Sequence, residues 1–526
     1  MKSLMKRVFA AAAAIATVFG LAATTVATAN AADNATLTVS TTDAKFAGKT
    51  VNAYKMFSAT VSGDGKAVSY TLTDEWKPFF KNSVGLTGVT DENVNDKAND
   101  YVSKLKDSTL VAFATKASNW AQTKANNITA DATATVSADA SNGKYTATFT
   151  GLGYGYYVVA VPGATNAKSQ YATLVSVHST KVDADIKGDL PTVDKKVQVD
   201  GTGKDATDAK IGDTLTFTLT STIPDMSAYD TYTFNFKDTL SKGLTFGQVK
   251  SVKVENVTLT ENTDYTVTTP TASNNNTLTV AMKDFKTKQQ ANAGKKITVT
   301  YTATLNKDAV VGGAGNVNSA KIQYSNNPST NGTGESEPSK VRVFTYGFTV
   351  DKYTGDQYTD AATRLAGAEF TLAHKDGSAI SFVQVSAGSA TANAVYRVAK
   401  AGETGTTTIT TPANGKVVFE GLENGEYTLT ETKAPAGYNK LASAIGVKVD
   451  GQNNGTDTTN ATVTITYNND NGNDYNQTAS NGVIPVQNKS GAILPGTGGM
   501  GTIAFTVIGV LVIALGVAWT LKRKNA

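Results

Sequence analysis

The segment Pro191–Val199 reads PTVDKKVQV, and its valines fall on alternate positions. This period of two is typical of a β-strand that buries one face. Lys195 is in phase with Val193 and Val197, so the pattern places this lysine on the same face as the valines. The segment therefore predicts a β-sandwich strand with a lysine turned into the core.

Similar short segments rich in Thr, Val, Tyr and Gly extend on both sides, separated by Asn-Gly, Asp-Gly and Gly-rich turns. They predict an all-β chain of tandem immunoglobulin-like β-sandwich domains in an elongated rod. The composition breaks at Lys187–Pro191 and at Ser325–Ser339. We expect three domains: an N-terminal β-sandwich with a helical insertion (residues 32–190), a second β-sandwich (residues 191–340) and a third (residues 341–490).

Both ends of the chain carry targeting patterns. Three basic residues precede the apolar run Val8–Ala23, and the small residues of Ala29–Ala31 follow, which predicts a signal peptide over residues 1–31. Residues 501–521 contain no charge and match the length of a transmembrane helix. The basic tail, residues 522–526, predicts a cytoplasmic end, with the main part of the chain outside the cell.

Composition excludes several classes of site. Without the three positive charges of the signal segment and the three of the tail, the net charge of +4 becomes −2, so no nucleic-acid partner is expected. The chain has no cysteine and two histidines, which excludes disulfides, Cys-based zinc sites and thiol catalysis and argues against a His-containing catalytic triad. We expect no metal, no cofactor and no enzyme.

Two further segments of the second domain place a polar residue on an apolar face. Asp238 is in phase with Phe236, and Asn318 is in phase with Ile322. Because burying such groups unpaired costs several kcal/mol, we expect them to meet Lys195 in the core. The alternative is that Lys195 reaches solvent at a strand end and Asn318 caps a turn.

A buried lysine beside an acid and an asparagine can react. Desolvation favours the neutral amine and the protonated carboxyl, and a neutral amine can attack the asparagine side-chain carbonyl while the acid shuttles protons to departing ammonia. The product is an isopeptide bond. Closing a loop of about 120 residues in this way stabilises by roughly 4 to 5 kcal/mol in the chain-entropy model.

The third domain repeats this pattern. Lys352 is in phase with Val350, Glu431 with Leu429, and Asn488 with the strand that precedes it. The alternative is a solvated lysine and a loop asparagine. In the first domain Lys55 lies in an apolar set, but no inward acid or late asparagine matches it, so we expect no bond there.

Three motifs carry a family resemblance. The pentapeptide Leu494-Pro495-Gly496-Thr497-Gly498, before an apolar run and a basic tail, is similar to the LPxTG sorting signal of Gram-positive surface proteins. Gly425–Tyr438 (GEYTLTETKAPAGY) is similar to the E-box of pilins and collagen-adhesin B-type domains. The segments Pro191–Lys195, Ile211–Asp213, Asp238–Leu244 and Asn318–Tyr324 resemble isopeptide-forming middle domains of the major (shaft) subunits of sortase-assembled pili.

The resemblance implies a fimbrial subunit in which sortase cuts between Thr497 and Gly498 and joins Thr497 to a lysine of the next copy. It also implies two internal bonds, Lys195–Asn318 with Asp238 as the acid and Lys352–Asn488 with Glu431 as the acid.

The acceptor lysine is less well marked. Pilin motifs typically read Tyr-Pro-Lys-Asn, whereas here Ile186 and Gly188 flank Lys187, so Lys187 is assigned by position, with Lys181 as its rival. The alternatives are an ordinary linker lysine, a juxtamembrane linker in place of the sorting signal, a monomeric wall-anchored adhesin and a secreted wall-active enzyme. The implied partners are pilus-class and housekeeping sortases, further copies of the chain, tip and base pilins, peptidoglycan, and a host matrix protein or glycan.

Overall fold

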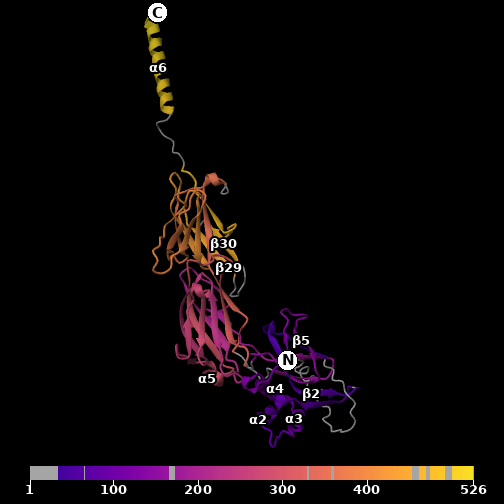
Figure 1. Cartoon of the computed structure of the whole chain (residues 1–526). Coiled ribbons are helices and arrows are strands. Elements are labelled where there is room, and N and C mark those ends of the chain that lie inside the picture. The colour runs from indigo at the N-terminus through magenta and orange to yellow at the C-terminus, as the bar shows by residue number, and fades with distance from the viewer. Residues whose placement is uncertain are drawn as a thin grey trace.

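The structure is a computed structural model that describes residues 34–63, 65–164, 172–328, 331–356, 360–452, 461–468, 474–491 and 500–524. The described residues up to 491 form three β-sandwiches in chain order, each made of two sheets, and Met500–Lys524 form the helix α6 (Figure 1). The predicted mostly-β tandem architecture is confirmed. The predicted signal peptide, residues 1–31, and the sorting motif, residues 494–498, lie outside the described residues.

The first domain combines eight described strands with three helices. The strands are β1 (Ala35–Thr41), β2 (Thr50–Val61), β3 (Val68–Leu72), β4 (Ala132–Thr135), β5 (Tyr145–Leu152), β6 (Gly155–Ala160), β7 (Ala172–Val177) and β8 (Lys181–Asp185), and the helices are α2 (Lys77–Asn82), α3 (Val94–Ser103) and α4 (Asp107–Gln122). One sheet has the order β5-β1-β8, and the other has the order β3-β2-β6-β7 with β4 paired to β2.

The helices cover the outer face of the larger sheet of the first domain. Phe79, Phe113 and Ala117 from α2 and α4 pack with Phe57 of β2 and Val158 of β6. All six residues of β6 are buried, because the small sheet covers one face of this strand and the helices cover the other. The helical insertion expected in the first domain corresponds to α3 and α4, and α2 is a further helix that the sequence pattern did not indicate.

The second domain is a sandwich of a six-stranded and a seven-stranded sheet. Its elements are β9 (Asp194–Val199), β10 (Thr202–Lys204), β11 (Ala206–Asp208), β12 (Thr214–Thr222), β13 (Phe234–Leu240), β14 (Leu244–Val254), β15 (Val257–Thr258), β16 (Tyr265–Thr268), β17 (Thr277–Met282), α5 (Phe285–Gln289), β18 (Lys296–Leu305), β19 (Asn316–Ser325), β20 (Thr333–Glu335) and β21 (Ser339–Phe344). The sheet orders are β10-β9-β12-β18-β14-β15 and β11-β21-β19-β13-β17-β16, with β20 paired to β19.

The third domain is a sandwich of a five-stranded and a six-stranded sheet. Its strands are β22 (Tyr346–Tyr353), β23 (Glu369–His374), β24 (Phe382–Ser386), β25 (Ala394–Val398), β26 (Ile409–Thr410), β27 (Lys416–Leu422), β28 (Gly425–Lys433), β29 (Ile445–Gln452), β30 (Thr462–Asn468), β31 (Gln477–Thr478) and β32 (Val483–Gln487). The sheet orders are β24-β25-β27-β22-β32 and β26-β23-β28-β29-β30-β31.

The strand pairing moves one expected boundary. We placed the end of the second domain at residue 340, but β21 pairs with β19 and β11 as far as Phe344, so this strand belongs to the second sandwich. The third sandwich begins with Tyr346, and Thr345 is the single residue between the two strands. A junction this short ties the two domains closely together.

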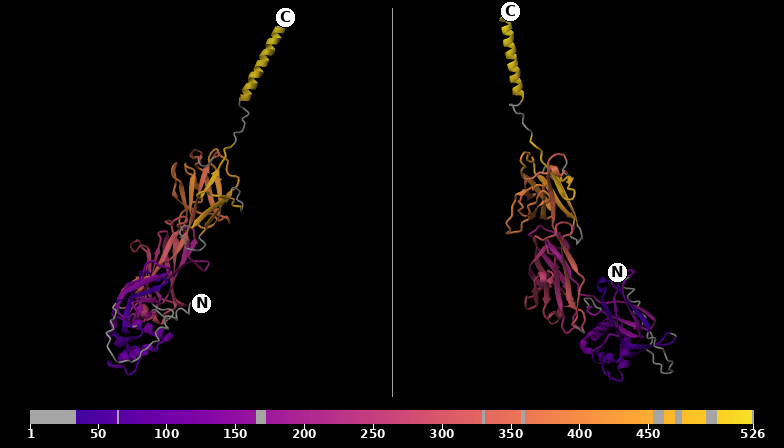
Figure 2. Two further views of the ribbon diagram at one scale, coloured as in Figure 1. Left: turned by 90° about the vertical axis from the view of Figure 1, so that its right-hand side faces the viewer. Right: turned by 45° about the horizontal axis from the view of Figure 1, so that its top comes forward.

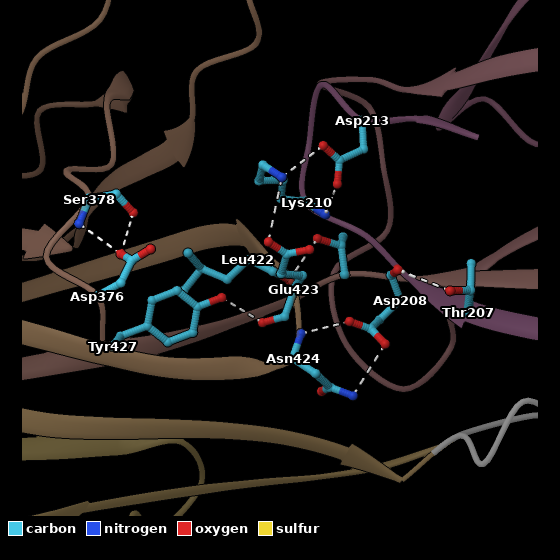
Figure 3. A network of polar contacts seen from close by, with 11 residues as sticks. Thr207, Asp208, Lys210, Asp213, Asp376, Ser378, Leu422, Glu423, Asn424 and Tyr427 are labelled. Atoms are coloured by element: carbon cyan, nitrogen blue, oxygen red, sulfur yellow. Dashed lines mark hydrogen bonds and ion pairs between the residues drawn. The ribbon is translucent and has the colours of Figure 1, made fainter. Parts of the chain in front are cut away.

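Side chains and backbone of both domains meet at this junction (Figure 3). Asn424, in the turn between β27 and β28, donates its backbone N–H to Asp208 Oδ2 at 2.8 Å and its side-chain amide to Asp208 Oδ1 at 3.3 Å. Lys210 Nζ lies 2.9 Å from Asp213 Oδ1 and 3.5 Å from Glu423 Oε1. The second domain is therefore tied to the third by two different residues of one turn.

Gly421 makes the closest approach at the same place. Its carbonyl accepts the backbone N–H of Ile211 at 3.0 Å, and its φ of +83° lies in the left-handed region. A Cβ on Gly421 would lie 2.6 Å from Ile211 Cδ1, so a side chain at this position would force the Ile211 side chain to move, in addition to the strain of the positive φ.

The first domain lies to one side of the second, away from the axis along which the second and third domains are stacked (Figure 2). Its contacts with the second domain include polar side-chain contacts, from Lys49 Nζ to the carbonyl of Glu335 at 3.3 Å and from Asn119 Nδ2 to Ser227 Oγ at 3.2 Å. The expected elongated rod is therefore bent at the junction between the first and second domains.

Candidate functional site: two buried lysine, acid and asparagine sets

In the second domain, three polar side chains enter the core from three strands. Lys195 comes from β9 in one sheet, whereas Asp238 of β13 and Asn318 of β19 come from the facing sheet. All three side chains are fully buried. The structure thus brings together the three residues that the period-two pattern turned inward, and a link between Lys195 and Asn318 would join the two sheets.

Lys195 is held by charge and by aromatic rings. Its Nζ donates hydrogen bonds to Asp238 Oδ2 and, at 2.8 Å, to the hydroxyl of Tyr301. It also lies 5.1 Å from the ring centroid of Phe217 and from that of Tyr301. These partners orient the amine inside a site that excludes water.

Tyr301 is a site residue that the sequence reasoning missed. Its hydroxyl donates to Asp238 Oδ2 at 2.6 Å and accepts from Asn318 Nδ2 at 2.6 Å, in addition to its contact with Lys195. The signal was present, because Tyr301 in β18 is in phase with Val299 and with other inward residues of the strand. The alternation pattern indicates only that the ring of Tyr301 is buried. It gives no information on the hydrogen bonds of the hydroxyl.

The site is not fully satisfied in hydrogen bonds. Asp238 Oδ1 and Asn318 Oδ1 are buried and have no hydrogen-bond partner. A buried acceptor without a donor is costly, so the unreacted set leaves two unsatisfied oxygens in the core.

Burial changes the proton affinity of the amine. Desolvation lowers the pKa of Lys195 from 10.5 to about 8, although the charge of Asp238 and its hydrogen bond act in the opposite direction. A neutral amine is a nucleophile, so this lysine is closer to its reactive form near neutral pH than a lysine in water.

The third domain assembles a second set by a different route. Lys352 lies on β22, and Asn488 directly follows β32, which pairs with β22 in parallel so that Lys352 is opposite Val486. Glu431 enters from β28 in the facing sheet. All three side chains are buried, and a link between Lys352 and Asn488 would join the first and last strands of the domain within one sheet.

The carboxylate of Glu431 reaches both partners. Lys352 Nζ and Glu431 Oε1 form an ion pair at 3.0 Å, but the angles between them do not meet those of a hydrogen bond. Asn488 Nδ2 donates a hydrogen bond to Glu431 Oε2 at 3.0 Å. The backbone N–H of Leu441 also donates to Oε2, at 2.8 Å, which fixes the carboxylate. Desolvation lowers the pKa of Lys352 to about 8, opposed by Glu431.

The two candidate acceptor lysines lie at opposite ends of one short stretch. Lys181 begins β8 and is exposed. Lys187 follows the strand, and its side chain is only 29% exposed, with its Nζ 3.6 Å from Asp185 Oδ2. Lys187 is therefore half-buried and loosely paired, whereas its rival Lys181 is exposed.

Lys55 of the first domain does not belong to a comparable set. Its Nζ lies 5.6 Å from the ring centroid of Tyr157, and it is half-buried at the domain surface. Among the residues that the structure describes, no cluster of three acidic, histidine or cysteine side chains could hold a metal ion.

At the C-terminal end, α6 spans Met500–Lys524, and its side chains are described at positions 506–521 and 523. Within the described part of the chain, no helix is long and apolar enough to cross a membrane. The transmembrane helix expected over residues 501–521 therefore stays a prediction from the sequence.

Two protein-family models match the chain over the second and third domains. Residues 211–328 match the Gram-positive pilin backbone subunit 2, Cna-B-like domain, and residues 356–464 match the SpaA prealbumin-like fold domain. The chain carries pilin-family domains. The pilin matches include both acids and Asn318, whereas Lys195, Lys352 and Asn488 lie outside them.

Individual pilins are similar to the chain at low identity. The trypsin-resistant surface T6 protein of Streptococcus pyogenes serotype M6 is 24% identical over an alignment of 338 residues. The alignment covers 56% of this chain and 55% of that protein, so it spans about half of the relative's length. Among solved structures, the T6 backbone pilin of the same organism has 19% identity and a TM-score of 0.46, covering 87% of this chain and 99% of that one. The major pilin SpaA of Corynebacterium diphtheriae has 15% identity and a TM-score of 0.46, covering 87% and 100%.

The lowered lysine pKa values predict a pH dependence for a variant that lacks both asparagines. In an Asn318→Ala, Asn488→Ala variant, the unfolded chain holds the protons of Lys195 and Lys352 between about pH 8 and 10.5, whereas the folded chain has released them. Because the unfolded state then binds more protons, the contribution of each lysine to the free energy of unfolding should rise from pH 8 to pH 9.5 by roughly 1.5 kcal/mol.

Urea unfolding of the variant at several pH values measures this slope. Adding Lys195→Met and Lys352→Met should remove this contribution, so the difference between the two profiles reports the lysines without the opposite slope of the buried tyrosines, whose pKa values burial raises. Two profiles that run parallel over this pH range would contradict the burial of neutral lysines.

Proposed function

We propose that this chain is a structural pilus subunit. One internal Lys–Asn isopeptide bond crosslinks the second domain and another crosslinks the third, and a sortase joins the chain to further copies. The observation that supports the proposal most strongly is the same in both pilin domains. Each holds a fully buried lysine Nζ against a carboxylate, with an asparagine side-chain amide in the same hydrogen-bond network.

The proposed bonds form without a cofactor. In the third domain, Lys352 Nζ passes a proton to Glu431 and attacks Asn488 Cγ, and the Cγ–Nδ2 bond breaks as Glu431 returns the proton to Nδ2. Two lysine protons leave with the nitrogen as ammonium, and the carboxylate is regenerated. Since each set reacts once and only with itself, this chemistry does not make the chain an enzyme.

The position of the proposed third-domain bond suits a fibre under tension. A bond between β22 and the end of β32 joins the first and last strands of the domain, so a pull on its two ends passes through the bond and not through the sheet hydrogen bonds. The absence of cysteine from the chain leaves no disulfide to do this.

Intact-mass measurement of residues 32–491 tests the bonds. Each bond releases one ammonia, so the purified chain should be about 34 Da lighter than its sequence mass, about 17 Da for each bond. Asn318→Ala and Asn488→Ala should each abolish one of the two losses, and Asp238→Ala and Glu431→Ala should act in the same way.

Digestion and peptide sequencing should then locate branched peptides at Lys195 and Lys352. A wild-type chain at its full sequence mass would contradict the proposed isopeptide bonds. It would not bear on the proposal that a sortase acts at the sorting signal.

The assembly half of the proposal rests on sequence. Leu494–Gly498, the apolar run 501–521 and the tail 522–526 have the order of a sortase signal, which supports an anchored precursor that a transpeptidase cuts after Thr497. A pilus-class sortase would pass the Thr497 carbonyl to another copy, and a housekeeping sortase would pass it to peptidoglycan. Tip and base pilins and a host matrix or glycan ligand complete the proposed partners.

We propose Lys187 as the acceptor amine. It follows β8 in the connection between the first and second domains, which lies at the opposite end of the stacked second and third domains from the C-terminus (Figure 1). Joining Thr497 of one copy to this connection on the next would therefore add copies head to tail. Lys181, which is exposed, remains the rival.

Co-expression with a pilus-class sortase tests the acceptor. The wild-type chain should give a ladder of high-mass forms on denaturing gels, and Lys187→Arg should abolish it while leaving the monomer at the surface. Lys181→Arg is the matched control and should keep the ladder. Loss of the ladder in Lys181→Arg alone would move the acceptor to that residue, and a wild-type chain that stays monomeric would favour the wall-anchored adhesin.

A further inference from the structure

The second and third domains use different residues to connect the acid with the lysine and the asparagine. In the third domain one carboxylate reaches both reacting groups, because Glu431 places Oε1 at Lys352 Nζ and Oε2 at Asn488 Nδ2, each at 3.0 Å. A single group can therefore take the proton from the amine and return it to the leaving nitrogen.

The second domain has an acid that is one carbon shorter. Asp238 lies opposite Ala320 on the neighbouring strand, and Asn318 lies opposite Leu240, so the acid and the asparagine are diagonal neighbours on adjacent strands. Such positions have Cβ atoms about 7 Å apart, and in the structure the two side chains are not hydrogen-bonded to each other. Asp238 contacts Lys195 Nζ, but Asn318 Nδ2 donates to the hydroxyl of Tyr301.

Tyr301 occupies the gap. Its hydroxyl oxygen accepts from Lys195 Nζ at 2.8 Å and from Asn318 Nδ2 at 2.6 Å, and its hydrogen is donated to Asp238 Oδ2 at 2.6 Å. The hydroxyl uses all of its hydrogen-bonding capacity on the acid, the nucleophile and the leaving group. A tyrosine present only for packing would not require this.

We propose that Tyr301 is a catalytic residue of bond formation in the second domain, relaying the proton between Asp238 and the nitrogen that leaves Asn318. This inference rests on the proposed function, since it concerns the Lys195–Asn318 bond. Asp238 and Tyr301 together then do what Glu431 does alone in the third domain.

The proton steps balance. Lys195 Nζ gives one proton to Asp238, attacks Asn318 Cγ and forms the new C–N bond. Once Asp238 Oδ2 carries this proton, it can donate to the Tyr301 oxygen, and the phenolic hydrogen turns from Oδ2 to Nδ2, whose lone pair is free in the tetrahedral adduct. Asp238 then passes its proton to the Tyr301 oxygen as the phenolic proton moves to Nδ2, and the Cγ–Nδ2 bond breaks. The second proton of Nζ passes to the departing ammonia, which leaves as ammonium, and Asp238 and Tyr301 return to their starting forms.

The surroundings suit a neutral relay. Burial and the charge of Asp238 raise the pKa of Tyr301 well above its usual value, so the hydroxyl keeps its hydrogen at rest. A concerted shift passes the proton on without forming a buried phenolate. The ring itself stacks on Phe217 with centroids 5.3 Å apart, which holds the hydroxyl in place.

Tyr301→Phe tests the relay, because it keeps the ring and removes only the hydroxyl. The chain, residues 32–491, is pulse-labelled in cell-free synthesis, and both bonds are followed over time by peptide mass spectrometry. The Lys195–Asn318 bond should form about 10²- to 10⁴-fold more slowly, the range expected for loss of a general acid–base group. The Lys352–Asn488 bond of the same molecule should form at the wild-type rate.

Tyr232→Phe is the matched control. Tyr232 is also buried in the second domain, and its hydroxyl has no hydrogen-bond partner, so this variant should form both bonds normally. A Lys195–Asn318 bond that forms in Tyr301→Phe within about threefold of the wild-type rate would overturn the relay while leaving the stapled pilin intact. If the wild-type chain formed neither bond, that result would contradict the proposed function itself, and not only the role of Tyr301.

A second measurement on the wild-type chain covers the case in which Tyr301→Phe folds poorly. Bond formation is followed in mixtures of H₂O and D₂O after synthesis has been stopped. The relay moves two protons together in the second domain, so the rate should fall along a curve as the deuterium fraction rises, whereas the third domain should give a straight line. A straight line for both bonds would overturn the relay.

Discussion

A lysine that is buried without water needs a partner, and both pilin domains are built around this requirement. Moving an ammonium into a core costs several kcal/mol, and a carboxylate recovers this cost only in good geometry. Lys195 and Lys352 have the carboxylates of Asp238 and Glu431, yet burial still lowers both lysine pKa values to about 8. The pairs are therefore poised for proton transfer, and an asparagine side chain lies within each network.

The sandwich fold produces this arrangement from simple strand geometry. In the second domain the lysine and the asparagine come from facing sheets, and in the third they come from adjacent parallel strands of one sheet. The acid enters from the asparagine's sheet in one case and from the facing sheet in the other. Two different placements that bring together the same three groups argue that the chemistry of the set matters more than a particular strand pairing.

Much of this could be predicted from the sequence, because a period of two decides which face a residue occupies. This pattern predicts that the side chains of Lys195, Asp238 and Asn318 point into the core, and all three are buried in the structure. Tyr301 was missed because the same pattern cannot distinguish a tyrosine that packs from one whose hydroxyl bonds. The half-buried state of Lys187 could not be predicted, because it depends on contacts made in the folded chain that local alternation does not report.

The ends of domains and the short helix α2 also depend on tertiary contacts that local sequence patterns do not report. Composition placed the second junction at residue 340, but strand pairing carries the second sandwich to Phe344, and only tertiary contacts reveal that. Helix α2 was missed since its six residues are too few to show a helical period. Its buried phenylalanines belong to a core completed by residues distant in sequence.

The central claim is that each buried lysine is covalently joined to its asparagine. A high-resolution crystal structure of residues 32–491 tests it most directly, through the distance from Nζ to Cγ at the pairs Lys195–Asn318 and Lys352–Asn488. The account predicts continuous density and a separation of about 1.3 Å, the length of an amide C–N bond. Separate side chains, with these atoms about 3 Å or more apart and the asparagine amide nitrogen still in place, would contradict it.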